Sequence, residues 1–390
     1  MPCDATCRKS STRRVHGHRS HGTRYVVIVT VLSFVAGLVL LVVGAELLVR
    51  GAGKLAIRFG VAPLVVGLTV VAFGTSSPEM AVSVGSARNG NVDIAVGNVV
   101  GSNIFNVLFI LGACALIAPL LINRQIIRKE VPIMIAASLL LIALGADGEI
   151  QRYDGIILFL LVIVYTVLLI RQSRKETKSG EADLEAEGIS LSSTWDQKLP
   201  VQIALVIGGL VLLVIGAEWL VDAAISFADS LGVSKLVIGL TIVAAGTSMP
   251  EVATSVLATI RGERDIAVGN VIGSNIFNIL AVVGISAIVA PDPLVISGAV
   301  QNFDFWVMLV VAAACLPIFF TGSTIARWEG GVFVLYYVAY AAYLVLDSQD
   351  HSATGTYTTA MLLFVIPITV VTISIVAVRE WRARSQAPAV

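Results

Sequence analysis

Long apolar runs separated by short polar segments organise this sequence. Eleven runs approach or reach the length of about 20 residues that a helix needs to cross a bilayer. They lack the strict alternation of barrel strands, so helices remain the way to satisfy backbone polar groups in lipid. The pattern therefore predicts an all-α polytopic membrane protein. The expected spans are 25–49, 61–87, 94–118, 131–144, 156–170, 201–224, 236–260, 266–290, 305–320, 330–346 and 358–378.

The composition narrows the class of protein further. Hydrophobic residues make up 57% of the chain and charged residues only 13%, against about 25% in soluble domains. A soluble fold needs more polar surface than this, so a soluble globular enzyme and a disordered chain are excluded. The 26 basic residues balance the 26 acidic residues, so no positive excess is present for nucleic acid. The lipid bilayer is the partner that this composition predicts.

Basic residues predict which loops face the cytoplasm. Outside the N-terminal tail, one set of loops holds 17 Lys and Arg residues and the other set holds 3. The richer set includes a hydrophilic central linker, 172–199, and the C-terminus, which are therefore expected to be cytoplasmic, with the N-terminus outside. The N-terminal tail, 1–24, opposes this rule because it carries six basic residues itself.

The chain contains an internal repeat. Residues 67–112 and 239–284 share 29 identities over 46 positions without a gap. The repeat divides the protein into two halves of five spans, 25–171 and 200–347, followed by an additional C-terminal helix within 356–379. Because five is odd, the halves are predicted to insert with opposite topology. Inverted repeats place a substrate site near the bilayer midplane, where the halves meet.

The first repeated motif predicts a broken helix inside the membrane. It reads Gly-Thr-Ser-Ser-Pro-Glu at 74–79 and Gly-Thr-Ser-Met-Pro-Glu at 246–251, each within an apolar span. Proline removes a backbone donor and clashes with the carbonyl one turn earlier, so each helix should break there. Carbonyl groups near Ala72 and Ala244 are then expected to be freed toward a cavity, where broken backbone is tolerated in a membrane.

Oxygen-bearing side chains converge at each break. Thr75 and Ser76 lie four and three residues before Glu79 and share its helical face. The same spacing recurs in the second half with Thr247, Ser248 and Glu251. In the second motif, polar residues repeat every four positions on one face, at Asn98, Ser102 and Asn106 and again at Asn270, Ser274 and Asn278.

These groups form a set of hard oxygen ligands. Calcium takes about six to eight oxygens from carboxylates, amides and carbonyls, and sodium uses the same atoms. The two motifs contain none of the soft ligands that select zinc or copper. A charge at mid-membrane costs roughly 2.5–3.5 kcal/mol on insertion scales and indicates a functional site. Glu79 and Glu251 are therefore predicted to hold a cation.

The paired GTSxPE and GNVxGSNIFN segments resemble the two alpha-repeats of the cation/calcium exchanger superfamily, in particular its prokaryotic sodium/calcium exchangers. The resemblance implies an antiporter in which sodium and calcium compete at overlapping sites, while the first and sixth spans slide to alternate access. By motif match, Glu79 and Glu251 would hold calcium and Asn106 would lie at the centre. The implied sodium ligands are Thr75, Ser76, Ser102, Thr247, Ser248, Ser274 and the carbonyl groups of Ala72 and Ala244.

Two features depart from the family pattern. Many sodium/calcium exchangers carry an aspartate where this chain has Asn278, so Asn278 enters the candidate site as a neutral ligand. The ten-span plan of the family also lacks the run 358–378.

These observations predict a secondary antiporter that exchanges calcium for sodium across the cell membrane, without a cofactor and without an obligate protein partner. A calcium/proton antiporter on the same fold is the alternative, because protons can also discharge two carboxylates. A passive channel is disfavoured because the sequence has no pore-ring repeat. An enzyme is not expected, because the spans contain no paired nucleophile and base.

The basic-residue count leads to a test of orientation. In a chain whose tail cysteines are replaced by serine, a cysteine introduced at Ser179 or at Ser385 should resist membrane-impermeant thiol reagents in intact cells. Both positions should react once the membrane is permeabilised, which controls for burial. Ready labelling from outside would show that the orientation is the reverse.

Overall fold

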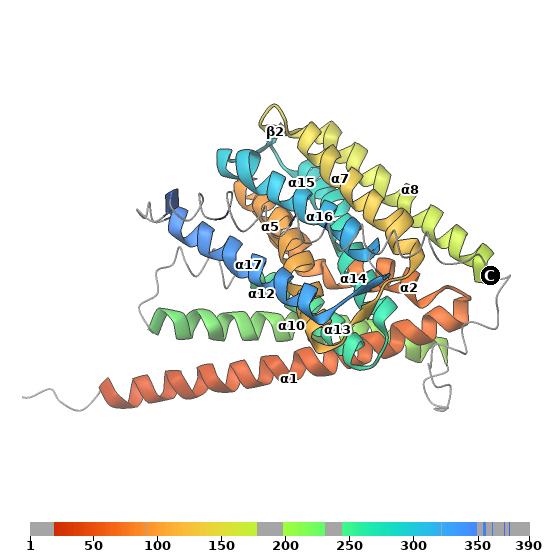
Figure 1. Ribbon diagram of the computed structural model, residues 1–390. Coiled ribbons are helices and arrows are strands. Elements are labelled where there is room, and N and C mark those ends of the chain that lie inside the picture. Colours follow the sequence, from red (N-terminus) through yellow and green to blue (C-terminus); the bar gives the residue numbers. More distant parts are fainter. Residues whose placement is uncertain are drawn as a thin grey trace, which may run out of the picture.

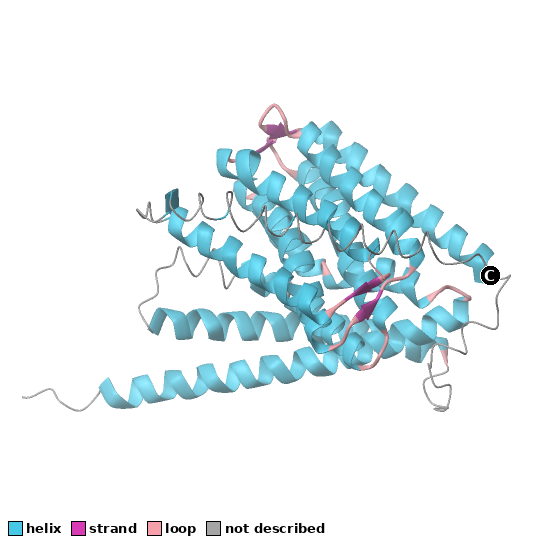
Figure 2. Ribbon diagram, viewed as in Figure 1, coloured by secondary structure: helices cyan, strands magenta, loops and turns pink. Residues whose placement is uncertain are grey.

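The computed structural model describes residues 19–90, 92–177, 198–230, 244–320 and 322–348, with five further isolated positions, and is almost entirely helical (Figure 2). The first half contains α1 (Arg19–Phe59), α2 (Pro63–Val66), η1 (Gly67–Val71), α3 (Ala72–Thr75), α4 (Ser77–Arg88), α5 (Val92–Phe105), η2 (Asn106–Leu111), α6 (Gly112–Ile117), β1 (Leu120–Leu121), η3 (Ile126–Glu130), α7 (Val131–Leu144), β2 (Glu149–Ile150) and α8 (Arg152–Thr177). The second half contains α10 (Leu199–Ser230), α12 (Ala244–Thr247), α13 (Met249–Ile260), α14 (Arg264–Phe277), η6 (Asn278–Val283), α15 (Gly284–Val289), β3 (Leu294–Val295), η7 (Val300–Asp304), α16 (Phe305–Phe320), β4 (Thr324–Ile325) and α17 (Arg327–Ser348).

The helices coincide with most of the expected membrane spans. Among the described residues, seven helices are long and apolar enough to cross a membrane, and the bent pair Pro63–Thr75 and Ser77–Arg88 raises this to eight. The fourth expected span forms α7 with the expected bounds, but at 14 residues it is short, and the charged residues of η3 precede it. The expected C-terminal span, 358–378, lies outside the described residues except at isolated positions.

Several helices, including α1 and α8, extend beyond the apolar runs that predicted them. Helix α1 begins at Arg19, inside the segment expected to be a tail, and α8 continues to Thr177, past the expected start of the linker. At the end of α8 the added residues include Gln172, Arg174, Lys175 and Glu176, which are good helix formers, so the backbone continues as helix after the apolar run ends. Hydropathy alone therefore underestimates the length of these two helices.

Two central helices lie inside the bundle. One consists of α5, η2 and α6, and the other of α14, η6 and α15. In their most apolar stretches 72% and 89% of the residues are buried, against 17% in α17. The outer helices expose large apolar side chains instead, including Leu168 on α8, Val310 on α16 and Leu335 on α17. The outer surface is thus suited to contact with lipid, while the central helices are covered by protein.

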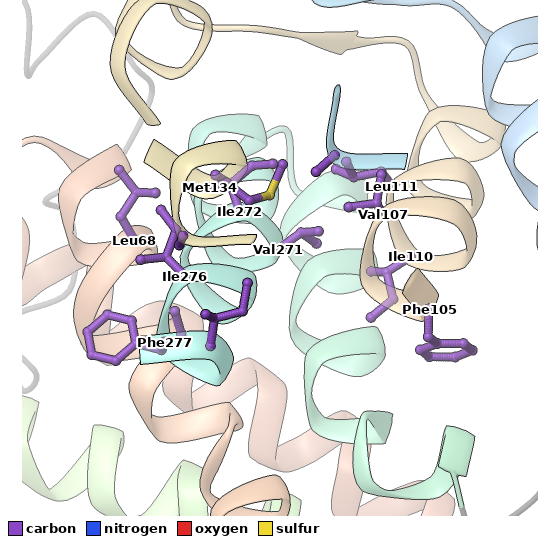
Figure 3. Packing of buried hydrophobic residues seen from close by; sticks show 14 of the residues in the cluster. Leu68, Phe105, Val107, Ile110, Leu111, Met134, Val271, Ile272, Ile276 and Phe277 are labelled. Atoms are coloured by element: carbon purple, nitrogen blue, oxygen red, sulfur yellow. The ribbon is translucent and has the colours of Figure 1, made fainter. Parts of the chain in front are cut away.

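Apolar side chains from both halves fill the space around the central helices (Figure 3). Leu68 of η1 is fully buried, as are Ile272 and Ile276 of α14. The backbones also come close, because a Cβ added at Gly273 would lie 2.7 Å from the carbonyl oxygen of Leu68. Glycine therefore allows the broken span of the first half to pack directly against α14 of the second half.

Helices α1 and α10 lie side by side along one side of the bundle (Figure 1). A Cβ added at Gly44 would lie 2.8 Å from the carbonyl oxygen of Gly209, and one added at Gly37 would lie 2.8 Å from that of Gly216. Gly37 comes before Gly44 on α1, whereas Gly216, which faces Gly37, comes after Gly209 on α10. The two helices therefore run in opposite directions. Small residues let the two backbones touch, which favours helix packing in lipid.

Two short antiparallel strand pairs join the halves at the ends of α7 and α16. β1 pairs with β4 through Leu120 and Ile325, and β2 pairs with β3 through Ile150 and Leu294. The β1–β4 pair lies at the start of α7 and the end of α16. The β2–β3 pair lies at the end of α7 and the start of α16. The strand pairs therefore lie at opposite ends of two antiparallel helices.

Gly209 tests the packing of α1 against α10. A Cβ at Gly209 would lie 2.7 Å from the carbonyl oxygen of Gly44, whereas a Cβ at the neighbouring Gly208 meets no described atom within 4 Å. Gly209→Ala should therefore lower the free energy of unfolding by about 1–3 kcal/mol, the usual cost of overpacking. Gly208→Ala should be neutral or stabilising, because alanine favours helix. Thermal unfolding of the purified variants compares them, and equal melting temperatures would contradict this packing.

Candidate ion-binding site

The helix breaks that the prolines predict are present in both halves. α3 and α4 flank Ser76, whose φ is −77° and ψ is 10°, and the two segments meet at a bend of 44°. α12 and α13 flank Ser248, whose φ is −88° and ψ is 10°. Each break places a glutamate, Glu79 or Glu251, in the first turn of the helix that follows. The partial positive charge at a helix N-terminus favours a carboxylate at this position.

Each glutamate receives a hydrogen bond from a serine of the other half. Ser248 donates to Oε1 of Glu79 at 2.8 Å, and Ser76 donates to Oε1 of Glu251 at 3.2 Å. Both carboxylates are completely buried. The hydroxyl oxygen of Ser102 lies 3.2 Å from that of Ser248 and so joins the same contact. The two broken spans therefore meet at their breaks, and the candidate residues of both halves come together.

The threonines of the motif contact asparagines of the opposite half. Thr75 donates to Oδ1 of Asn270 at 3.1 Å, and Thr247 donates to Oδ1 of Asn98 at 3.4 Å. The sequence pattern placed these two asparagines on the ligand-bearing face. In the structure their Oδ1 atoms instead accept hydrogen bonds from the threonines, so they connect the halves rather than offer free ligands.

The carbonyl group of Ala72 is not freed by the break. It still accepts its helical hydrogen bond from the amide of Ser76 at 3.0 Å, so the expectation of a freed carbonyl is wrong for Ala72 itself. Pro78 lacks the amide that would bind the carbonyl four residues earlier. That carbonyl belongs to Gly74, two residues after Ala72, so the Ala72 carbonyl keeps its own donor. The hydroxyl of Ser274 lies 3.5 Å from the same oxygen, which places both groups at the site. Ala244 occupies the matching position as the first residue of α12.

Four buried oxygen atoms at the site have no hydrogen-bond partner among the described residues. They are Oε2 of Glu79, Oε2 of Glu251, Oδ1 of Asn106 and Oδ1 of Asn278. All four residues are completely buried, and a buried acceptor without a partner is costly unless a ligand satisfies it. Two carboxylate oxygens and two amide oxygens are suitable ligands for a hard cation such as calcium or sodium.

The backbone geometry changes at the two central asparagines. The π-helical segment η2 begins at Asn106, and η6 begins at Asn278. Short π-helical turns inside α-helices are rare and occur frequently at functional sites. No feature of the sequence analysis predicted them, because the apolar period is the same on both sides of each turn.

Two further asparagines belong to the site and were not among the predicted residues. Nδ2 of Asn278 donates to Oδ1 of Asn103 at 3.1 Å, and Nδ2 of Asn106 donates to Oδ1 of Asn275 at 3.2 Å. Asn103 and Asn275 follow the serines by one residue, which turns them about 100° away from the predicted face. The signal that could have found them is the duplication of the whole Gly-Ser-Asn-Ile-Phe-Asn segment.

The charge of the site comes from two carboxylates alone. Across the part of the chain that the structure describes, no group of three or more His, Cys, Asp or Glu side chains could hold a metal ion. A cation between Glu79 and Glu251 would therefore complete its shell with neutral oxygens. Hydroxyl, amide and carbonyl oxygens of the two motifs surround the carboxylates and can supply them.

A separate group of charged residues lies at the turn between α13 and α14. Arg261 pairs there with Glu46 of α1. Burial raises the pKa of the nearby Glu263 carboxyl to about 7, an effect that Arg261 opposes and that repulsion from Glu46 increases. This group ties α1 to the end of α13 and contributes no residue to the candidate ion site.

Comparison with known proteins identifies the family. The family model described as "Sodium/calcium exchanger protein" matches residues 29–171 and 201–346. The chain belongs to this family. The two matched segments include every candidate ligand, and the family is one of membrane transporters.

Several relatives match this exchanger along most of their length. It is 37% identical to the "Putative antiporter CaxA" of Alkalimonas amylolytica over 83% of this chain and 100% of the relative. It is 33% identical to the "Sodium/calcium exchanger MaX1" of Methanosarcina acetivorans over 82% and 99%. A solved structure of the sodium-calcium exchanger NCX_Mj superposes with a TM-score of 0.69 at 30% identity, covering 81% of this chain and 98% of that one. The exchanger is therefore a multi-pass integral membrane protein with an all-α fold.

Removing either carboxylate should abolish calcium binding. Calcium at about 100 times its dissociation constant would stabilise the wild-type protein by about 2.7 kcal/mol. Glu79→Gln and Glu251→Gln should each lose this stabilisation, because one remaining charge undercompensates a divalent ion. Glu149→Gln, on strand β2, is the matched control and should keep it. Melting temperatures with and without calcium chloride measure the effect, and a wild-type shift in either site variant would contradict the site.

Proposed function

We propose that this exchanger is a secondary antiporter that moves calcium against sodium across the cell membrane at the site between Glu79 and Glu251. The observation that carries the proposal is the set of four unpartnered buried oxygen atoms, two from each half. Membership of the exchanger family supports cation/calcium antiport. The relative MaX1, which bears the name sodium/calcium exchanger, supports sodium as the second ion.

Charge balance accounts for exchange at a single site. Two carboxylates neutralise one calcium ion, and they also neutralise two sodium ions. Two uncompensated carboxylates in a buried site would be costly, so the empty, charged site is disfavoured relative to either loaded state. Release of one ion is therefore coupled to arrival of the other, which is the requirement for antiport rather than leak.

We assign the ligands by their chemistry. The free oxygens of the two glutamates and of Asn106 and Asn278 would contact calcium, since carboxylate and amide oxygens suit it. Sodium needs no additional carboxylate and would use the neutral oxygens around the breaks. Those proposed sodium ligands are Thr75, Ser76, Ser102, Thr247, Ser248, Ser274 and the carbonyl oxygens of Ala72 and Ala244. The Ala72 oxygen would bind sodium through its second lone pair, since it keeps its helical hydrogen bond.

The antiparallel pair formed by α1 and α10 is the proposed moving part. Its two backbones touch through glycines, so the pair can shift as one body. One of its helices, α10, also lies against both helix breaks, because a Cβ added at Gly74 would lie 2.5 Å from the Leu210 side chain and one added at Gly246 would overlap the Val221 side chain. A shift of this pair would open the site to one side of the membrane and then to the other. The opposite directions of α1 and α10 support the proposed inverted topology of the halves.

The remaining parts of the proposal follow from the sequence. The halves, 25–171 and 200–347, would be joined by a cytoplasmic linker, 172–199, with the N-terminus outside and the C-terminus inside. The transported ions occupy the site themselves, so the cycle requires no resident cofactor. A calcium/proton antiporter is the alternative function, because both carboxylates can also be discharged by protons.

Calcium uptake by proteoliposomes distinguishes sodium from protons. Vesicles loaded with sodium should take up calcium-45 from a sodium-free medium at equal pH on both sides, with a proton ionophore present. Vesicles loaded with choline instead, and vesicles without protein, should not. Uptake that ignores sodium and needs an imposed pH gradient would overturn the sodium proposal in favour of calcium/proton exchange.

A further inference from the structure

An amide side chain can face a cation in two ways, and only one of them is favourable. Its Oδ1 atom is a ligand for a cation, while its Nδ2 group is a donor and repels one. Asn106 and Asn278 are completely buried at the site, so each must be held with its oxygen toward the ion. Neither asparagine can fix its own orientation, and the groups around it have to do so.

Asn103 fixes the orientation of Asn278. Nδ2 of Asn103 donates to the backbone carbonyl of Asn275 at 3.3 Å and lies 3.7 Å from the sulfur of Met308. Both partners can only accept, so the amide nitrogen of Asn103 must face them and its Oδ1 must face away. That Oδ1 accepts Nδ2 of Asn278 at 3.1 Å. The Oδ1 of Asn278 is thereby turned away from Asn103 and is one of the four unpartnered oxygens.

The second half repeats this arrangement. Nδ2 of Asn275 donates to the sulfur of Met134 at 3.3 Å, and Met134 is buried next to α14 (Figure 3). A thioether sulfur accepts and cannot donate, so Oδ1 of Asn275 faces the other way and accepts Nδ2 of Asn106 at 3.2 Å. The Oδ1 of Asn106 is then left without a partner among the described residues.

We propose that Asn103 and Asn275 are positioning residues, each of which orients the central asparagine of the opposite half so that its carbonyl oxygen faces the transported cation. The proposal rests on the ion site described under the proposed function. It extends that site by two residues that lie behind the ligands and do not contact the ion. Asn103 and Asn275 themselves are only 3% and 2% exposed, so water does not compete for these hydrogen bonds.

The same contacts restrict the charge that position 278 can carry. An ionised aspartate there would place a carboxylate oxygen against Oδ1 of Asn103, where the structure has a donor. Asn103 could turn its amide only by losing its hydrogen bond to the carbonyl of Asn275. The geometry therefore favours a neutral donor at position 278 and keeps the charge of the site at that of Glu79 and Glu251.

A double-mutant cycle tests whether Asn103 acts through Asn278. Asn103→Leu keeps the size of the side chain and should raise the apparent KM for calcium about tenfold, as expected for a lost buried hydrogen bond. In the Asn278→Ala background it should add little, because its target is gone. In the Asn106→Ala background it should act in full, since the contacts are crossed between halves. Asn302→Leu, an exposed asparagine on η7, is the control and should leave KM unchanged.

The measurement separates positioning from packing. Initial rates of calcium-45 uptake give KM and maximal rate, and the calcium-induced melting shift gives affinity without transport. A rise in KM that disappears in the Asn278→Ala background supports positioning. Lower stability with unchanged calcium affinity, or equal effects in both alanine backgrounds, would overturn it.

Two further outcomes are also informative. If Asn103→Leu does not fold, the equivalent cycle of Asn275→Leu with Asn106→Ala takes its place. If neither leucine variant folds, the role of Asn103 and Asn275 is packing, and the proposal is overturned. If wild-type vesicles show no sodium-driven uptake, the proposed function fails, while the cycle measured by the calcium-induced melting shift still decides the role of Asn103.

Discussion

The hydrogen bonds from Ser248 to Glu79 and from Ser76 to Glu251 join the two halves at the points where both helices are interrupted. A carboxylate without a donor or a counter-ion is costly in an apolar interior, so these contacts require the two breaks to lie side by side. The placement of the rest of the bundle is consistent with this requirement. The central helix α14 packs against the broken span of the first half, and α10 lies against both breaks.

Glycine makes this arrangement possible because the backbones of the two halves have to come within van der Waals contact. Gly273 brings α14 onto η1, and Gly44 brings α1 onto α10. The first contact belongs to the buried centre, while the second belongs to two helices that otherwise expose apolar side chains. The molecule is thus divided into a central part, which holds the proposed ion ligands, and an outer pair, which carries none of them.

The two halves contribute equally to the proposed ion site, so the forces between them would depend on whether an ion is bound. Each half provides one carboxyl oxygen and one amide oxygen without a partner. An ion bound there would contact both halves at once, so its presence or absence would change the balance of forces between them. The neutral amides add ligands without adding charge, and Asn103 and Asn275 hold those amides in the orientation that a cation needs.

Local interactions determined what the sequence alone could predict. The apolar period predicted the helices, proline predicted the breaks at Ser76 and Ser248, and the four-residue spacing predicted which polar groups share a face. Contacts between residues far apart in the chain could be decided only by the tertiary structure. The bond between Ser248 and Glu79 joins residues 169 positions apart, and the bond between Asn278 and Asn103 joins residues 175 apart. Which serine holds which glutamate, and which way each amide faces, depends on how the two halves pack, and no local pattern contains that information.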